Sequence, residues 1–264
     1  GSMHDGPGVR TVVYFKGCNL VCRWCHNPEG LSPEPQLMIR KSACIRCGAC
    51  KTKCAHPDCI KFNRCLHACP PGLISVCGYR TDADSLAKKL HGYTPFFKNG
   101  GGVTFSGGEP LMQPEFTAEL FRLLHEHGVH TALDTAGAGD LEKAEAVLKH
   151  TDLVLCDVKF AEEADYRAHC GGSLAHTLDF LRLTARLDIP VWVRHVVAPG
   201  LTDMPASLRA VRDLCAAFSN IEKIEWLPFK NICAEKYEAL GIPFPMAGRP
   251  AYTQKHIDML LQAL

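Results

Sequence analysis

Residues 17–28 read Gly17-Cys18-Asn19-Leu20-Val21-Cys22-Arg23-Trp24-Cys25-His26-Asn27-Pro28 and follow the apolar run Thr11–Phe15. The three cysteines have the spacing C-x3-C-x2-C. A [4Fe–4S] cube takes four thiolates, one for each iron. Three thiolates leave one iron open to a non-protein ligand, which indicates chemistry at the cluster. The alternatives are a disulfide pair or structural zinc, which closes its shell with four ligands, His26 being the fourth.

Composition limits the class of protein. The chain has 264 residues, 47% of them hydrophobic, which suits one α/β barrel domain. Its net charge is +1 with no basic run, so we expect neither a nucleic acid nor a membrane as partner. No segment reaches the roughly 18–20 apolar residues that span a bilayer. The opening Gly1-Ser2-Met3 resembles the remnant of an expression tag, and no secretory signal follows it.

The cysteines are numerous and unevenly distributed. There are fifteen, and outside two clusters near the start of the chain only four remain: Cys156, Cys170, Cys215 and Cys233. A secreted disulfide scaffold would be small and poor in core residues, whereas most of this chain is ordinary α/β sequence. We therefore interpret the clustered thiols as metal ligands of a cytoplasmic, oxygen-sensitive protein.

Beyond residue 80 the sequence alternates short apolar strands with amphipathic helices. Helices are expected from about Thr81, where Thr81–Asp84 resembles a capping box, from Pro114 to about Gly128, and from about Thr253. Three further helices are expected over Asp140–Lys149, Ala175–Arg186 and Pro205–Phe218. Six strands are expected, namely Thr11–Phe15, Val103–Ser106, His130–Asp134, Leu153–Asp157, Val191–Val197 and Ile224–Leu227.

Polar residues stand at or just beyond the carboxyl ends of these strands. A charged group after nearly every strand indicates that the strand ends meet at one site, as at the top of a β/α barrel. The sequence therefore predicts an α/β fold, a partial (β/α)6 barrel over residues 4–39 and 80–264. The residues concerned are Glu109, Asp134, Asp157, Lys159, Arg194 and Lys230.

Residues 40–79 interrupt the alternation and are predicted to form an inserted iron–sulfur module. They contain no periodic element long enough to build a core, so their fold needs stabilising cross-links. The run Cys44-x2-Cys47-x2-Cys50-x3-Cys54 is typical of bacterial ferredoxins, in which the fourth cysteine ligates the other of two clusters.

The second run of the module is irregular. Aligning Cys65-x3-Cys69-Pro70 with the end of a ferredoxin run leaves Phe62 where a cysteine belongs, and Cys77 could replace it. The alternative is one cluster with spare thiols. The simplest division is Cys44, Cys47, Cys50 and Cys69 for one cube, and Cys54, Cys59, Cys65 and Cys77 for the other.

Three motifs resemble one known family. The cysteine loop, Asp5-Gly6-Pro7-Gly8-Val9-Arg10 before it and Ser106-Gly107-Gly108-Glu109-Pro110 after it are similar to those of glycyl radical enzyme activating enzymes. This is a radical S-adenosylmethionine (SAM) family, and the resemblance covers nearly the whole chain. It implies a radical SAM barrel with a ferredoxin-like insert, three [4Fe–4S] clusters and SAM as cofactors.

The resemblance also implies a set of site residues. Cys18, Cys22 and Cys25 would hold the catalytic cluster, and Trp24 would lie against the adenine of SAM. Relatives have histidine where this chain has Lys230, so that contact departs from the family pattern. The remaining residues implied for the cofactor, or for a monovalent cation at Asp134 and Asp157, are Cys25, His26, Gly107, Gly108, Glu109, Asp134, Thr135, Asp157, Val158, Lys159, Arg194 and Lys230.

The implied reaction is one-electron cleavage of SAM to a 5′-deoxyadenosyl radical. That radical abstracts hydrogen from a backbone glycine of a partner glycyl radical enzyme. Residues Asp5–Arg10 of this chain are expected to grip the partner's glycine loop. Flavodoxin or ferredoxin is the expected reductant, and the chain is expected to be a monomer. Two alternatives stay open: a radical SAM enzyme acting on a peptide or small molecule, and a ferredoxin-like carrier or zinc protein without catalysis.

Overall fold

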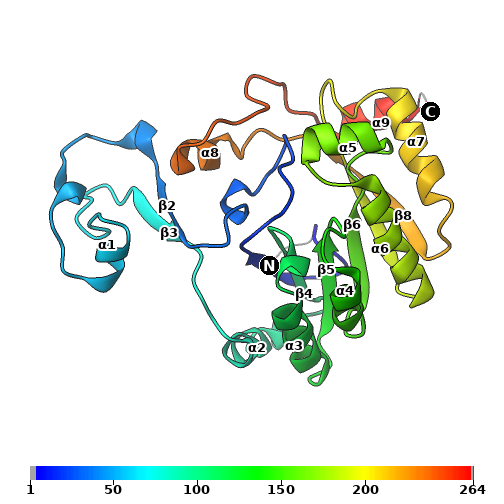
Figure 1. The fold of residues 1–264 in the computed structure, drawn as a ribbon, viewed down its shortest axis with the longest axis horizontal. Helices are drawn as coiled ribbons and strands as arrows, with labels where there is room; N and C mark the ends of the chain where they lie inside the picture. Colours follow the sequence, from blue (N-terminus) through cyan, green and yellow to red (C-terminus); the bar gives the residue numbers. More distant parts are fainter. Residues whose placement is uncertain (1–3, 263) are drawn as a thin grey trace.

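The computed structural model describes residues 4–262 and 264; the Gly1-Ser2-Met3 interpretation lies outside the described residues. Six parallel strands form one sheet in the order β1-β4-β5-β6-β7-β8 (Figure 1). The strands follow one another in chain order without reversal. Right-handed crossovers then put all the intervening helices on one face, so the sheet curls into a partial barrel and is not doubly wound.

The six predicted strands are all present, with bounds shifted by up to three residues. In β7–β8 the register shifts between Val191 and Trp192, and β8 begins three residues before the predicted start. The strands are β1 Arg10–Phe15, β4 Gly102–Gly107, β5 His130–Thr135, β6 Leu153–Asp157, β7 Val191–Val197 and β8 Ile221–Pro228.

The expected helices are also present, and three others were not expected: α5 Glu163–Cys170, α8 Ala234–Leu240 and the five-residue α1 Pro57–Lys61 of the cysteine-rich segment. Asp82 caps α2 by accepting a hydrogen bond from the Ser85 amide, so the cap lies one residue after Thr81. Short α5 and α8 were missed because their periodic patterns are only two turns long. The others are α2 Ala83–His91, α3 Pro114–His125, α4 Leu141–Leu148, α6 Leu174–Arg186, α7 Pro205–Cys215 and α9 Gln254–Gln262.

The core lies between the sheet and its helices. It is built from strand residues such as Phe105 and Val193 and helix residues such as Leu120 and Phe180, all fully buried. This packing fixes the sheet, and the loops after the strands are held at one end of it. Among the described residues, no helix combines the length and apolar character needed to cross a membrane.

The cysteine-rich segment projects away from the barrel. Strands β2 Gln36–Ile39 and β3 Ile74–Cys77 pair antiparallel and form its base. Residues 40–73 between them contain one α-helix, the five-residue α1 Pro57–Lys61. Figure 1 shows this segment in blue and cyan beside α8, on the opposite side of the barrel from α7. Its short elements agree with the expectation that it cannot build a core unaided.

Candidate active site

A cavity of about 350 Å³ lies at the carboxyl ends of the barrel strands. Val158 is the exception among the predicted site residues, because its side chain is fully buried in the core. The cavity is lined by every other predicted barrel-site residue: Cys18, Cys22, Trp24, Cys25, His26, Gly107, Gly108, Glu109, Asp134, Thr135, Asp157, Lys159, Arg194 and Lys230.

The cysteine loop after β1 is held by backbone hydrogen bonds on both sides. The amide of Cys18 donates to the Leu31 carbonyl at 3.2 Å. The amide of Val21 donates to the Cys170 carbonyl at 2.8 Å, and that of Arg23 donates to the His169 carbonyl at 3.1 Å. The protein therefore sets the path of this loop without any bound group.

Helix α8 gives a second support that the sequence did not reveal. The Lys236 ammonium donates to Glu29 at 2.6 Å, to the Asn27 side chain at 2.9 Å and to the His26 carbonyl at 3.2 Å. The Tyr237 hydroxyl donates to the Cys25 carbonyl at 3.1 Å. Helix α8 thus fixes the end of the cysteine loop, and only tertiary contact could show this.

The three thiols differ in their surroundings. Burial raises the pKa of Cys18 to about 11 and that of Cys25 to about 12. The pKa of Cys22 falls to about 7, first because the Cys170 side chain hydrogen-bonds its sulfur and then because of the nearby Lys159 charge. Nothing in the sequence had marked Cys170, which is fully buried.

The two glycines after β4 are required by the backbone beside them. A Cβ on Gly107, whose φ is +108°, would lie 2.4 Å from the Phe15 nitrogen. A Cβ on Gly108 would lie 2.2 Å from the Gly17 carbonyl oxygen. These glycines let the end of β4 pack directly against the cysteine loop, which is a structural reason beside the predicted approach to a cofactor.

Glu109 is bonded within the protein. Its carboxylate accepts hydrogen bonds from the Thr135 hydroxyl at 2.6 Å and from the amides of Ala136 at 2.9 Å and Leu111 at 3.0 Å. Burial raises its pKa against these donors. Since a carboxylate has about four acceptor sites, one remains for a donor in the cavity.

Arg194 joins two carboxylates across the cavity. Its Nη1 lies 3.2 Å from Asp134 and 3.5 Å from Asp5, so protein carboxylates are partners of this mostly buried charge. Burial lowers the pKa of Arg194, but these carboxylates outweigh burial and raise it. Asp134 also accepts from the Ser106 hydroxyl at 2.6 Å, while its buried Oδ1 has no hydrogen-bond partner among the described residues.

Lys159 forms an ion pair with Asp157 at 2.7 Å, and both side chains are mostly buried. Burial opposes the charge on Lys159, but Asp157 and then Cys22 raise its pKa well above the ordinary value. The cavity thus holds a permanent cation beside the thiol with the lowest pKa of the three. That charge favours a bound anion or thiolate.

Three predicted side chains complete the wall. Trp24 is 4% exposed and packs edge-on against Phe160, with ring centroids 5.5 Å apart. His26 is partly buried, and burial followed by the Lys236 charge lowers its pKa. Lys230 lies at the rim, where its ammonium donates to the Tyr252 carbonyl at 2.9 Å.

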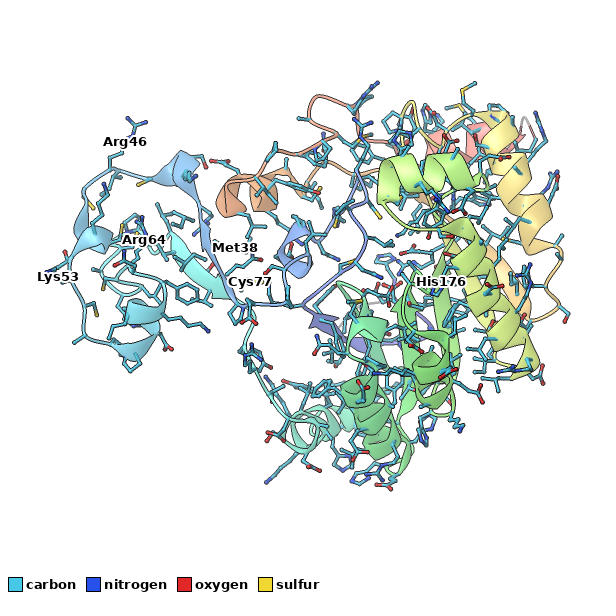
Figure 2. The ribbon with its side chains drawn as sticks, in the orientation of Figure 1. Met38, Arg46, Lys53, Arg64, Cys77 and His176 are labelled. Atoms are coloured by element: carbon cyan, nitrogen blue, oxygen red, sulfur yellow. The ribbon has the colours of Figure 1, made fainter. Side chains whose placement is uncertain are left out.

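The cysteines of the projecting segment fall into different environments. Cys44 and Cys47 are exposed, and the Arg64 guanidinium donates to the Cys50 sulfur at 2.9 Å. The sulfurs of Cys54, Cys59 and Cys65 lie within 4.8 Å of one another, whereas Cys77 does not join them. Cys77 is paired with Gln36 at the base of the segment, and Figure 2 labels Cys77 there, together with Met38 of the partner strand.

The chain is similar to several known proteins. The model of the radical SAM superfamily matches residues 12–209. The pyruvate formate-lyase-activating enzyme of Clostridium pasteurianum is 36% identical over 92% of this chain and 84% of that enzyme. The choline trimethylamine-lyase activating enzyme of Oleidesulfovibrio alaskensis is 32% identical over 97% of this chain and 90% of that enzyme.

Solved structures agree in fold. Streptococcus suis SuiB bound to precursor peptide SuiA aligns with 97% of this chain and 45% of its own, with a TM-score of 0.64 and 11% identity. At that identity the likeness concerns the fold alone, and it covers the strands whose ends form the cavity. On the family match and the identities above, this chain belongs to the radical SAM superfamily and, within it, to the activating enzymes of glycyl radical enzymes.

Proposed function

We propose that this chain activates a partner glycyl radical enzyme. The observation that carries the proposal is the convergence of Cys18, Cys22 and Cys25 with charged groups from β5, β6 and β7 in one cavity. A radical SAM domain uses a [4Fe–4S] cluster and SAM, which together supply a 5′-deoxyadenosyl radical that removes hydrogen from a glycine of the partner.

The residues present fit these two cofactors. Three thiols of one loop face the cavity and leave a fourth iron site without a protein ligand. The unpartnered Asp134 Oδ1 and the remaining acceptor site of Glu109 suit the ammonium of a methionyl group. Lys159 and Arg194 suit its carboxylate, and Trp24 offers an apolar wall for adenine. A monovalent cation stays a prediction, because Asp134 and Asp157 already pair with Arg194 and Lys159.

The chain's own residues would position the reacting groups. Arg194 ties Asp5 to Asp134, so the turn Asp5–Arg10 stands at the cavity wall. Arg10 is fully buried and donates to the Thr104 hydroxyl at 2.7 Å and to the Val103 carbonyl at 2.8 Å. The turn is therefore rigidly attached to β4. We propose that it meets the partner's glycine loop at the cavity mouth.

We propose that the projecting segment receives electrons. The set Cys44, Cys47, Cys50 and Cys69 would bind a [4Fe–4S] cube, with Arg64 offsetting the thiolate charge at Cys50. Residues 40–73 carry seven lysines and arginines against one acidic residue, Asp58. Figure 2 shows Arg46 and Lys53 at the outer edge of the segment. Such a basic surface favours binding of an acidic reductant protein, a flavodoxin or ferredoxin. We propose that the chain acts as a monomer in this reaction.

The test is a spectroscopic assay of a partner. The anaerobically reconstituted chain is mixed with SAM, a reductant and each candidate glycyl radical enzyme of the source genome. A glycyl radical signal by electron paramagnetic resonance in one partner is the expected result, with 5′-deoxyadenosine released in equal amount. The variant Cys22→Ser should give neither. Release of 5′-deoxyadenosine with a peptide or small molecule, and no radical in any partner, would overturn the proposal.

A further inference from the structure

Three cysteines of the projecting segment form a compact group. The sulfurs of Cys54, Cys59 and Cys65 all lie within 4.8 Å of one another. Cys59 is 1% exposed and Cys65 is 8% exposed, in a segment with almost no core of its own. The Leu66 amide donates to the Cys59 sulfur at 3.3 Å. The segment folds around these thiols.

The other cysteine sets of the chain are more open. No three sulfurs of the barrel loop, nor of the set Cys44, Cys47, Cys50 and Cys69, lie within 4.8 Å of one another in the described structure. A tetrahedral zinc with Zn–S bonds of about 2.3 Å keeps its sulfurs about 3.8 Å apart. A cube has a separate iron for each thiolate, so its ligands spread wider. The compact group therefore fits a single ion.

Histidines, not Cys77, stand beside this group. His56, Cys59 and His67 have ligand atoms within 4.8 Å of one another. The Nδ1 of His56 accepts a hydrogen bond from the Asp58 amide at 3.3 Å and lies 3.8 Å from the Asp58 carboxylate, so this ring is already engaged by Asp58. No such bond from an amide holds the ring of His67 in the described residues. His67 reaches Cys59 but does not lie within 4.8 Å of both Cys54 and Cys65, so closing a four-ligand shell requires its ring to move towards those sulfurs.

We propose that Cys54, Cys59, Cys65 and His67 bind one mononuclear zinc ion where a second cube was expected. Three thiolates and one imidazole form a closed Cys3His shell, which is typical of structural zinc. Phe62 stands where a ferredoxin run has a cysteine, and a single ion does not need that ligand. Zinc has no redox chemistry, so electron transfer through the segment would use the first cube alone. The inference is independent of which partner the chain activates.

The test counts metals in the full chain, purified without oxygen from cells supplied with iron and zinc. Elemental analysis should give one zinc and about eight irons per chain, from the barrel cube and the first insert cube. The variant Cys59→Ser should lose the zinc and keep the iron. About twelve irons with no zinc would overturn the proposal.

Matched variants identify the fourth ligand. In competition with a coloured chelator, His67→Ala should bind zinc at least tenfold more weakly, whereas His56→Ala and Cys77→Ser should bind it as the unmodified chain does. Cobalt(II) loaded at the same site should show the strong visible bands of a tetrahedral ion, and these should shift in His67→Ala only. Loss of zinc in Cys77→Ser with retention in His67→Ala would show that the ligand set is wrong.

Discussion

The two cysteine-rich regions of this chain are built on opposite principles. In the barrel, the loop of Cys18, Cys22 and Cys25 is hydrogen-bonded to Leu31, to α5 and to α8, so protein contacts set its path. In the projecting segment, the thiols contact one another and nearby residues of the same segment, such as Arg64 at Cys50 and Leu66 at Cys59. Its other long-range anchors include a short strand pair and the bond from the Ser42 amide to Glu238 at 2.9 Å. The barrel presents a site built by packed elements, whereas the segment, by our proposal, depends on bound metal for its fold.

Removal of metal is the strongest way to break this comparison. A chelator applied without oxygen should leave the barrel folded and unfold the segment, because binding free energy is folding free energy where no core exists. Limited proteolysis followed by mass spectrometry should then find cuts within residues 40–73 and none within 17–27. First cleavage in residues 17–27 would contradict the contrast.

Two glycine variants compare the regions at single-atom scale. In Gly108→Ala the new Cβ would meet the Gly17 carbonyl oxygen at 2.2 Å. We therefore expect the free energy of unfolding to fall by about 3 kcal/mol and the barrel cube to be lost. Gly48 has a φ of +76°, and a Cβ added there would meet nothing within 4 Å. In Gly48→Ala only the strain of the left-handed backbone remains, which should lower the free energy of unfolding by about 1 kcal/mol. Chemical unfolding and iron content measure both. Equal losses would refute a preformed barrel loop.

Acid should weaken the barrel through His195. This side chain is 1% exposed, its Nδ1 donates to the Val158 carbonyl at 2.7 Å, and burial lowers its pKa to about 4. The unfolded chain, with an ordinary pKa of about 6.5, binds the proton first as pH falls. The contribution of neutral His195 to the free energy of unfolding is therefore fully present above pH 6.5. As pH falls to 4, this contribution decreases by about 3 kcal/mol.

The variant His195→Gln isolates that effect, because glutamine keeps a donor for Val158 and does not titrate. The difference in unfolding free energy between the two proteins should be constant above pH 6.5 and should shrink as pH falls to 4.5. A difference that does not change with pH would show that His195 takes no part in acid sensitivity.

The smallest effect concerns the support from α8. Tyr237→Phe removes one hydroxyl that donates to Cys25, so the chain should lose about 1 kcal/mol of stability. The barrel cube should also be lost faster in air, as followed by its visible absorption. Tyr79→Phe, at a residue 70% exposed just after β3, is the matched control and should change neither quantity. Identical behaviour of the two variants would remove α8 as a support of the loop.

The sequence by itself determined the barrel and the residues of its cavity. Continuous apolar strands must be buried on both faces, and parallel strands bring their carboxyl ends together, so residues such as Asp134, Asp157 and Arg194 could be placed at one site from their positions alone. The cysteine loop was equally readable, because its spacing is local.

Only the tertiary structure decided which residues are in contact across long distances in the sequence. Arg194 was implied for the cofactor, and the fold also pairs it with Asp5 and Asp134. The support from Lys236 and Tyr237, and the contact of Cys170 with Cys22, join residues more than a hundred positions apart. Cys77 was assigned to a cluster by counting thiols, and that assignment stays a prediction; the fold adds that its backbone pairs with Gln36 at the base of the segment. Spacing along the chain fixes local ligand sets, but long-range partners depend on how the elements pack.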